Sequence, residues 1–205
     1  MSRFRPLSNA FYVRPADIVA PELLGRYLVR ELDGERTVAR LVEVEAYLGA
    51  DDPASHAFRG RTARNAAMFL AGGHAYVYFV YGMHFCLNVV TGESGVAHAV
   101  LLRAAEVVEG VETAAQRRGV SADAAPRLLA GGPARLCEAL GVDRAFDGAS
   151  LRRGELTLRE GEPVMPPAIA RGRRVGVAYA GRAAAWPLRF AVRASPALSR
   201  PLAAR

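Results

Sequence analysis

The stretch RTVARLVEVEAYL, residues 36–48, carries the strongest fold signal in the sequence. Its β-branched and apolar residues are typical of a buried β-strand. The preceding stretch RYLVREL, residues 26–32, predicts a second strand, and Asp33-Gly34 between the two is typical of a tight turn. We therefore expect a β-hairpin over residues 26–48.

The second strand of this hairpin has two chemically different faces. Alternate residues of a strand share a face, so Glu43, Glu45 and Tyr47 are expected together, opposite the apolar residues between them. Such a face is either an edge or solvent-facing surface, or part of a site. The following loop, residues 49–65, contains acidic, imidazole and arginine groups beside glycines, which is typical of a phosphate-contacting loop. This combination favours a site.

A second hairpin is predicted from AYVYFVYGMHFCLNVV, residues 75–90, which is interrupted at Tyr81-Gly82. The glycine permits a sharp reversal of the chain at that point. Alternation places Tyr76 and Tyr78 on one face and Tyr81 on the other face or at the tip. An aromatic ring at the tip is available to wedge into a stack of bases.

The rest of the sequence predicts helices and further strands around these two hairpins. Helices are expected at residues 14–25, for about two turns after the N-cap hydroxyl of Thr62, at 108–118 and at 133–141. Strands are expected at residues 97–107, 174–181 and 188–193, with loops over 152–174. The sequence thus predicts a mixed α/β (α+β) fold in a single domain over residues 1–205, in which helices cover a sheet.

Composition narrows the classes of function. The 205 residues have a formal net charge of +7 and a pI near 10.1, which favours a polyanionic partner, nucleic acid first and an anionic membrane surface second. All 27 residues counted as Lys+Arg are arginine. Without lysine, Schiff-base catalysis by a side-chain amine and P-loop nucleotide hydrolysis are excluded. No stretch has the apolar length of a membrane span or a signal peptide, so an intracellular protein is expected.

Cysteine and histidine form no metal-binding pattern in the sequence. Cys86 and Cys137 lie in unrelated segments, and reduced, buried thiols are their expected state. His74 is expected to cap a strand or lie on the surface, while His84 and His98 are expected to pack or to face a groove. No metal and no cofactor are predicted.

Three blocks of the sequence together resemble the alkyladenine (3-methylpurine) DNA glycosylase family. They are VEVEAYLGADDPASHAFRGRTARNAAMF at residues 42–69, YVYFVYGMHFCLNV at 76–89 and VLLRA at 100–104. The resemblance runs from about residue 4 to residue 201 and includes the late segments RVGVAYAG and PLRFAVR. It implies a curved antiparallel sheet and a hairpin that enters the minor groove of duplex DNA, flips out a damaged nucleotide and fills the gap.

The resemblance also implies a role for each matching residue. Glu45 matches the acid that activates water, and Arg103 matches the cation near the water and the sugar-phosphate. Tyr81 matches the intercalating aromatic residue and Met68 a neighbouring wedge residue. Asn88 matches the amide that disfavours normal guanine. The base pocket is expected to contain Tyr47, His56, Tyr78, Asn88 and Leu101.

These roles agree with the chemistry of purine loss. Departure of the purine leaves an oxocarbenium-like sugar, so a carboxylate at Glu45 both stabilises positive charge and takes a proton from water. An alkylated purine is already cationic, so it leaves without a strong acid and suits the aromatic faces of Tyr47 and Tyr78. Deaminated or etheno purines, which are neutral, need a hydrogen-bond donor, for which His56 is the obvious candidate. Because lysine is absent, a monofunctional enzyme that stops at an abasic site is expected.

Some assignments keep an alternative. Arg59, Arg61 and Arg64 either fork to phosphates that flank the flipped nucleotide or form a solvated basic loop. Glu43 either supports the site or makes a structural hydrogen bond to the backbone. The larger animal members of the family have a cysteine at the position of Ala99, so the range of lesions is not implied by the resemblance.

Two rival functions share the same residues. One is a non-catalytic nucleic-acid-binding module with the same basic surface. The other is a metal-dependent nuclease built on Glu43, Glu45 and Asp51-Asp52, although the two aspartates are interpreted as turn formers ahead of Pro53. The expected partner is duplex DNA that contains damaged purines. A monomer without an obligate protein partner is the expected state.

Overall fold

An antiparallel sheet of eight strands organises the protein in a computed structural model that describes residues 5–32 and 34–202. The strand order is β3-β4-β5-β2-β1-β6, with β8 pairing to β2 and β7 to β8. The strands are β1 (Tyr27–Leu32), β2 (Glu35–Leu48), β3 (Ala75–Val80), β4 (His84–Thr91), β5 (His98–Glu109), β6 (Leu156–Arg159), β7 (Ile169–Gly172) and β8 (Arg189–Val192). The expected first hairpin is the pair β1–β2 and the second is the pair β3–β4.

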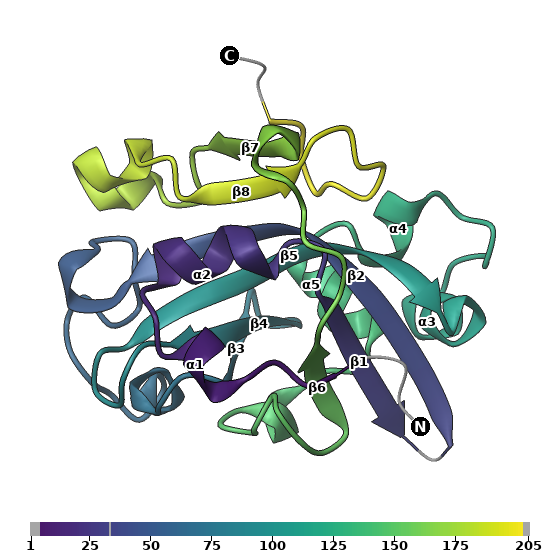
Figure 1. The fold of residues 1–205 in the computed structure, drawn as a ribbon, viewed down its shortest axis with the longest axis horizontal. Coiled ribbons are helices and arrows are strands. Elements are labelled where there is room, and N and C mark those ends of the chain that lie inside the picture. Colours follow the sequence, from purple (N-terminus) through teal and green to yellow (C-terminus); the bar gives the residue numbers. More distant parts are fainter. Residues whose placement is uncertain (1–4, 33, 203–205) are drawn as a thin grey trace.

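Short helices surround this sheet. They are α1 (Asn9–Tyr12), α2 (Ala16–Leu23), α3 (Val111–Arg118), α4 (Pro126–Ala130) and α5 (Pro133–Ala139). Short 3-10 turns are η1 (Gly49–Asp51), η2 (Ala66–Phe69), η3 (Arg144–Phe146), η4 (Pro166–Ala168) and η5 (Ala178–Ala185). Figure 1 shows α2 in front of β2 and β5, with β7 and β8 along the upper edge. The mixed α/β prediction is confirmed. Within the described ranges, no helix is long and apolar enough to cross a membrane.

The main core lies on one face of β2. Val44 and Ala46 are fully buried there with Val19 and Leu23 of α2. Burying an aliphatic side chain of valine or leucine size contributes roughly 1.5–3 kcal/mol, so this contact fixes which face of β2 points inward. The residues that alternate with Val44 and Ala46, among them Glu45, therefore point to the opposite side of the sheet.

Residues 174–181 are not the closing strand that the sequence predicts, and this expectation is wrong. The segment leaves the sheet and enters η5, with Gly176 and Gly181 at φ values of 76° and 57°. A regular strand does not tolerate this left-handed geometry. The strand that pairs with β8 at this edge of the sheet is β7, not residues 174–181.

The helix expected after Thr62 is also shorter than predicted. Thr62 and Asn65 bond reciprocally, with Asn65 Oδ1 accepting from the Thr62 N–H and Thr62 Oγ1 from the Asn65 N–H. This closes one tight turn before the four residues of η2, so Thr62 does not begin an α-helix. Helix α3 begins at Val111 rather than at residue 108, because β5 continues to Glu109. Asp33 of the first predicted turn lies outside the described residues.

Candidate active site

The strand register builds one face of the site. Glu45 of β2 lies opposite Leu101 of β5, Leu101 opposite Asn88 of β4, and Asn88 opposite Tyr76 of β3. Residues opposite each other on neighbouring strands have side chains on the same face of the sheet. Four strands therefore present one continuous row of side chains. The adjoining rows contribute the pairs Tyr47–Ala99 and Tyr78–Cys86.

A cavity of about 230 Å³ opens on this face. Ligand pockets commonly measure about 300–1,000 Å³, so the cavity suits a compact ligand. Its wall brings together these residues of the predicted set: Tyr47, His56, Met68, Tyr78, Asn88, Leu101 and Arg103.

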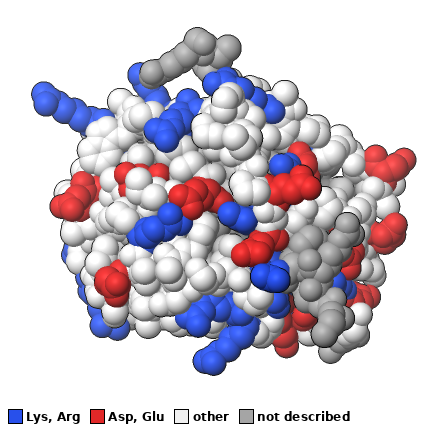
Figure 2. Space-filling view, in the orientation of Figure 1, with Lys and Arg blue, Asp and Glu red and all other residues white. Residues whose placement is uncertain are grey.

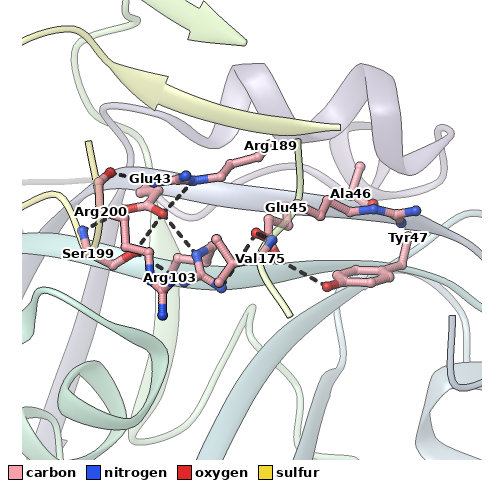
Figure 3. A network of polar contacts seen from close by, with 10 residues as sticks. Glu43, Glu45, Ala46, Tyr47, Arg103, Val175, Arg189, Ser199 and Arg200 are labelled. Atoms are coloured by element: carbon pink, nitrogen blue, oxygen red, sulfur yellow. Dashed lines mark hydrogen bonds and ion pairs between the residues drawn. The ribbon is translucent and has the colours of Figure 1, made fainter. Parts of the chain in front are cut away.

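Glu45 lies directly behind this wall. Its carboxylate is fully buried, and Oε2 accepts from the Tyr47 hydroxyl at 2.9 Å while Oε1 accepts from the Val175 N–H at 2.7 Å. Arg103 Nη1 lies 3.4 Å from Oε1 (Figure 3). All three partners line the cavity. A carboxylate accepts about four hydrogen bonds, so Glu45 keeps acceptor capacity for a water that enters between its partners.

Burial sets the protonation behaviour of Glu45. Removal of the carboxylate from solvent raises its pKa above the ordinary value, and the opposing effects of Arg103, the Val175 N–H and the Tyr47 hydroxyl do not cancel that increase. A carboxyl group whose pKa is raised toward neutrality is suited to take a proton in a reaction.

Arg103 and Glu43 form a second buried contact beside Glu45. Arg103 Nε donates to Glu43 Oε1 at 2.8 Å, and Arg189 Nε donates to the same oxygen at 2.8 Å. The backbone N–H of Ser199 donates to Glu43 Oε2 at 2.7 Å. Glu43 therefore contacts Arg103 of the predicted set and also bonds to the backbone.

The segment before Val175 is fixed by a buried ion pair. Arg174 Nη2 donates to Asp52 Oδ1 at 2.8 Å, Arg174 Nη1 contacts Oδ2, and both side chains are fully buried. The guanidinium lies 4.7 Å from the centre of the Tyr47 ring. Asp52 also accepts from the backbone N–H groups of Leu48, at the end of β2, and Ala54, as expected of a turn former. The pair thus connects the loop after β2 to the Glu45 partners Tyr47 and Val175.

Aromatic rings form the side of the cavity. Tyr76 and Tyr78 share a face as predicted, with ring centres 5.4 Å apart, and His56 meets Tyr78 edge-on at 4.6 Å. His56 Nδ1 lies 2.9 Å from the Tyr76 hydroxyl. Partial burial, with a smaller effect of Arg64, lowers the pKa of His56, so its imidazole is neutral at neutral pH. A neutral imidazole has one donor and one acceptor nitrogen to offer.

The tip of the β3–β4 hairpin projects into solvent. Tyr81 is 87% exposed, with φ of 54°, and Gly82 follows at φ of 70°. Met83 is also exposed, and its N–H closes the turn on the Val80 carbonyl. Met68, by contrast, is buried in the cavity wall. The exposed neighbour of Tyr81 is therefore Met83, which the sequence analysis did not single out.

Three exposed arginines lie in the loop beside this hairpin. Arg64 Nη2 donates to the Phe79 carbonyl at 3.1 Å, which ties the loop to β3, and the Arg61 guanidinium lies 5.9 Å from the Phe69 ring. Arg59 is exposed as well. In the orientation of Figure 2, arginine and acidic side chains are interspersed, so the positive net charge does not form one continuous patch on that face.

The remaining polar candidates have structural partners. His98 Nδ1 accepts from the N–H of Ala16 at the start of α2, and His84 Nδ1 lies 3.1 Å from Glu138. His74 Nδ1 lies 2.8 Å from a backbone carbonyl oxygen, and Cys86 and Cys137 are free and buried. Across the part of the chain that the structure describes, no three His, Cys, Asp or Glu residues gather as metal ligands would.

Comparison with known proteins decides the family. A family model described as methylpurine-DNA glycosylase matches residues 10–196. The chain belongs to this family. A Streptomyces avermitilis protein named "Putative 3-methyladenine DNA glycosylase" is 49% identical over 95% of this chain and 91% of its own length. Proteins of the same name from Myxococcus xanthus and Methanocella arvoryzae are 48% and 45% identical over 95% of this chain, and over 93% and 96% of their own lengths. The resemblance seen in the sequence is confirmed, and family membership implies a hydrolase that acts on N-glycosidic bonds in DNA.

Several groups of this candidate site were missed by sequence reasoning. Val175 contributes a backbone N–H, which leaves no side-chain signal. Arg174 and Ser199 reach the site from segments far from β2 in sequence. Tyr179 lines the cavity, is 70% exposed and donates to the Ala54 carbonyl at 3.0 Å. Residues 174–181 are part of the family resemblance, so the sequence contains a signal for this segment. Because the segment was predicted to be a strand, its position in the cavity wall was not predicted.

Proposed function

We propose that this methylpurine-DNA glycosylase is monofunctional and removes alkylated purines that are flipped out of duplex DNA into the cavity. The buried Glu45 carboxylate behind an aromatic wall, with Arg103 at 3.4 Å, is the observation that carries the proposal. The catalytic groups are Glu45 and Arg103. The flipped base lies among Tyr47, His56, Tyr78, Asn88 and Leu101.

The reaction follows from these groups. The bond between C1′ and the purine nitrogen breaks with both electrons leaving on the base, and positive charge develops on the sugar. A water attacks C1′ and transfers a proton to Glu45, whose raised pKa makes it an effective acceptor. Arg103 and the Val175 N–H hold the carboxylate in place. A cationic alkylated purine leaves as a neutral base and needs no strong acid.

The hairpin and the basic loop are assigned to DNA. Tyr81, the most exposed large side chain at the tip, fills the space that the flipped nucleotide vacates, with Met83 beside it. Met68 supports the base from the cavity wall. Arg59, Arg61 and Arg64 bind the flanking phosphates. Action as a monomer without an obligate protein partner is part of the proposal.

Base release from defined duplexes tests the proposal. Duplexes with a single 3-methyladenine, 7-methylguanine, hypoxanthine or ethenoadenine are incubated with enzyme, and mild alkali then reveals abasic sites. We expect release of the alkylated purines, with strand cleavage only after alkali, because the chain has no lysine to open the sugar. Cleavage before alkali would contradict the monofunctional assignment.

The variant Glu45→Gln separates catalysis from binding. General-base catalysis contributes about 10²–10⁴-fold, so we expect a loss of that size in the single-turnover rate, with lesion-duplex affinity retained. Equal excision by the wild type and the variant would overturn the role of Glu45. No excision of any lesion by the wild type would favour a non-catalytic binding module, and loss of activity in excess EDTA would favour a metal-dependent nuclease.

A further inference from the structure

The guanidinium of Arg103 is held at all three of its nitrogens. Nε donates to Glu43 at 2.8 Å, Nη2 donates to the Ser199 hydroxyl at 3.1 Å, and Nη1 lies 3.4 Å from Glu45. The Nη1 contact is the longest of the three. A planar guanidinium frequently forms two parallel hydrogen bonds with one carboxylate, and Arg103 does not form such a pair with Glu45.

Glu43 is the group that competes for Arg103. Its carboxylate is fully buried and accepts from Arg103, Arg189, the Ser199 hydroxyl and the Ser199 N–H at 2.7–2.8 Å. Figure 3 shows Arg103 between the carboxylates of Glu43 and Glu45. The cluster contains two carboxylates, Glu43 and Glu45, and two guanidinium groups, Arg103 and Arg189.

We propose that Glu43 is a positioning residue, which together with Ser199 turns the Arg103 guanidinium away from a paired contact with Glu45 and leaves that carboxylate free for the attacking water. This inference rests on the proposed function. Without Glu43, the nearest carboxylate for Arg103 is Glu45. A closed, two-bond pair would then occupy the Glu45 lone pairs that the water needs.

The charges around Glu45 give this arrangement a measurable effect. Glu43 raises the pKa of Glu45, after the larger effect of burial, whereas Arg103 lowers it. Loss of the Glu43 charge and closer approach of Arg103 act in the same direction, so both lower the Glu45 pKa. The other titratable groups that interact electrostatically with Glu45 are unchanged in a Glu43 variant. They are Tyr47, Tyr78, Cys86, Arg174 and Tyr179.

The pH dependence of single-turnover base release tests the proposal. Wild type and Glu43→Gln are compared between pH 5 and 9 on methylated duplex DNA, by the release of 3-methyladenine after subtraction of spontaneous loss. We expect Glu43→Gln to reduce the plateau rate about 10–100-fold, because small displacements of catalytic groups have effects of that size. We also expect the acidic limb of the profile to move to lower pH. A purely structural role would slow the reaction without moving that limb.

Glu106→Gln is the matched control. Glu106 is also a carboxylate of the sheet that contacts an arginine, Arg40, and a serine hydroxyl, Ser195, but it lies further along the strands. We expect its rate and profile to match the wild type. A Glu43→Gln profile with an unmoved acidic limb overturns the positioning role. Full activity of Glu45→Gln in the same assay would instead refute the proposed function.

Ser199→Ala provides a second variant that keeps every charge of the cluster. Loss of the Ser199 hydroxyl removes the hydrogen bond to Arg103 Nη2 and one of the hydrogen bonds to Glu43. We expect a several-fold lower plateau rate with unchanged affinity for the methylated duplex. If Glu43→Gln does not fold, this result decides the question, and an unchanged plateau rate contradicts the proposal.

Discussion

Glu45 connects the chemistry of the site to the stability of the protein. Its carboxyl group is fully buried, and burial raises its pKa above the ordinary value near 4.5. Between these two pKa values the folded protein holds a proton that the unfolded chain releases. Stability therefore falls as the pH rises through this window, because folding at higher pH requires burial of the charged form.

Replacement of Glu45 by glutamine should therefore stabilise the protein at neutral pH. The amide has nearly the same shape and no charge to bury, and a gain of 1 kcal/mol corresponds to about 2–4 °C in a protein of this size. We expect Glu45→Gln to melt above the wild type at pH 7.5 and the two to converge below pH 4.5. Thermal unfolding followed by circular dichroism at several pH values measures this. If the variant melts below the wild type at pH 7.5, the ionic contacts of the Glu45 carboxylate contribute more free energy than its burial costs.

At the scale of elements, the β3–β4 hairpin places a large side chain where the backbone does not favour it. Tyr81 and Gly82 both have positive φ, which is the geometry of a type I′ turn. A non-glycine residue in this region costs roughly 1–2 kcal/mol, less for asparagine. The exposed Tyr81 ring makes no core contact that offsets this cost. The presence of tyrosine at this position is therefore better explained by the proposed wedge role.

The variant Tyr81→Asn tests this explanation. It creates Asn-Gly, the preferred pair for a type I′ turn, so we expect the free energy of unfolding to rise by about 0.5–1 kcal/mol in urea. The same change removes the wedge, and we expect a smaller fluorescence change of a reporter base placed beside the lesion. The replacement Phe79→Leu serves as a control, because Phe79 is exposed near the end of β3 but not at the tip. An undiminished reporter signal for Tyr81→Asn would remove the wedge assignment.

The accuracy of prediction from sequence differs between elements for physical reasons. Alternation was sufficient for β2 and for the pair Tyr76 and Tyr78, because strand geometry is local. Arg103 entered through the family resemblance alone. The prediction of a strand at residues 174–181 is wrong because the apolar residues of this segment resemble those of a strand. Its glycines instead adopt positive φ values, which turn the chain along the cavity wall. The contacts of Ser199 and Arg174 depend on the tertiary fold and have no local pattern.

At the scale of the whole molecule, the formal net charge is +7, and every basic side chain other than histidine is an arginine. Each phosphate contact contributes about 0.9 to the slope of log affinity against log salt concentration. We expect replacement of Arg59, Arg61 and Arg64 by glutamine to reduce that slope by up to about 2.7. Fluorescence anisotropy of a labelled duplex between 50 and 300 mM salt measures the effect.

A charge-matched control identifies whether position matters. It removes the same number of arginines near α2, which packs on the opposite face of β2 from Glu45. The residues changed to glutamine in this control are Arg14, Arg26 and Arg171. We expect the salt slope of the control to stay close to the wild type. Equal slopes for both triple variants would show that the loop at residues 59–64 contributes only to the general charge.

The bond between Ser199 and Glu43 spans 156 residues of the chain. During translation, Glu45, Arg103 and the aromatic hairpin leave the ribosome long before residue 199. If the arrangement of Arg103 depends on Ser199, a nascent or prematurely terminated chain can contain every proposed catalytic side chain and still lack the full activity of the site. The rate of base removal would then reach its full value only after nearly the whole domain has been synthesised.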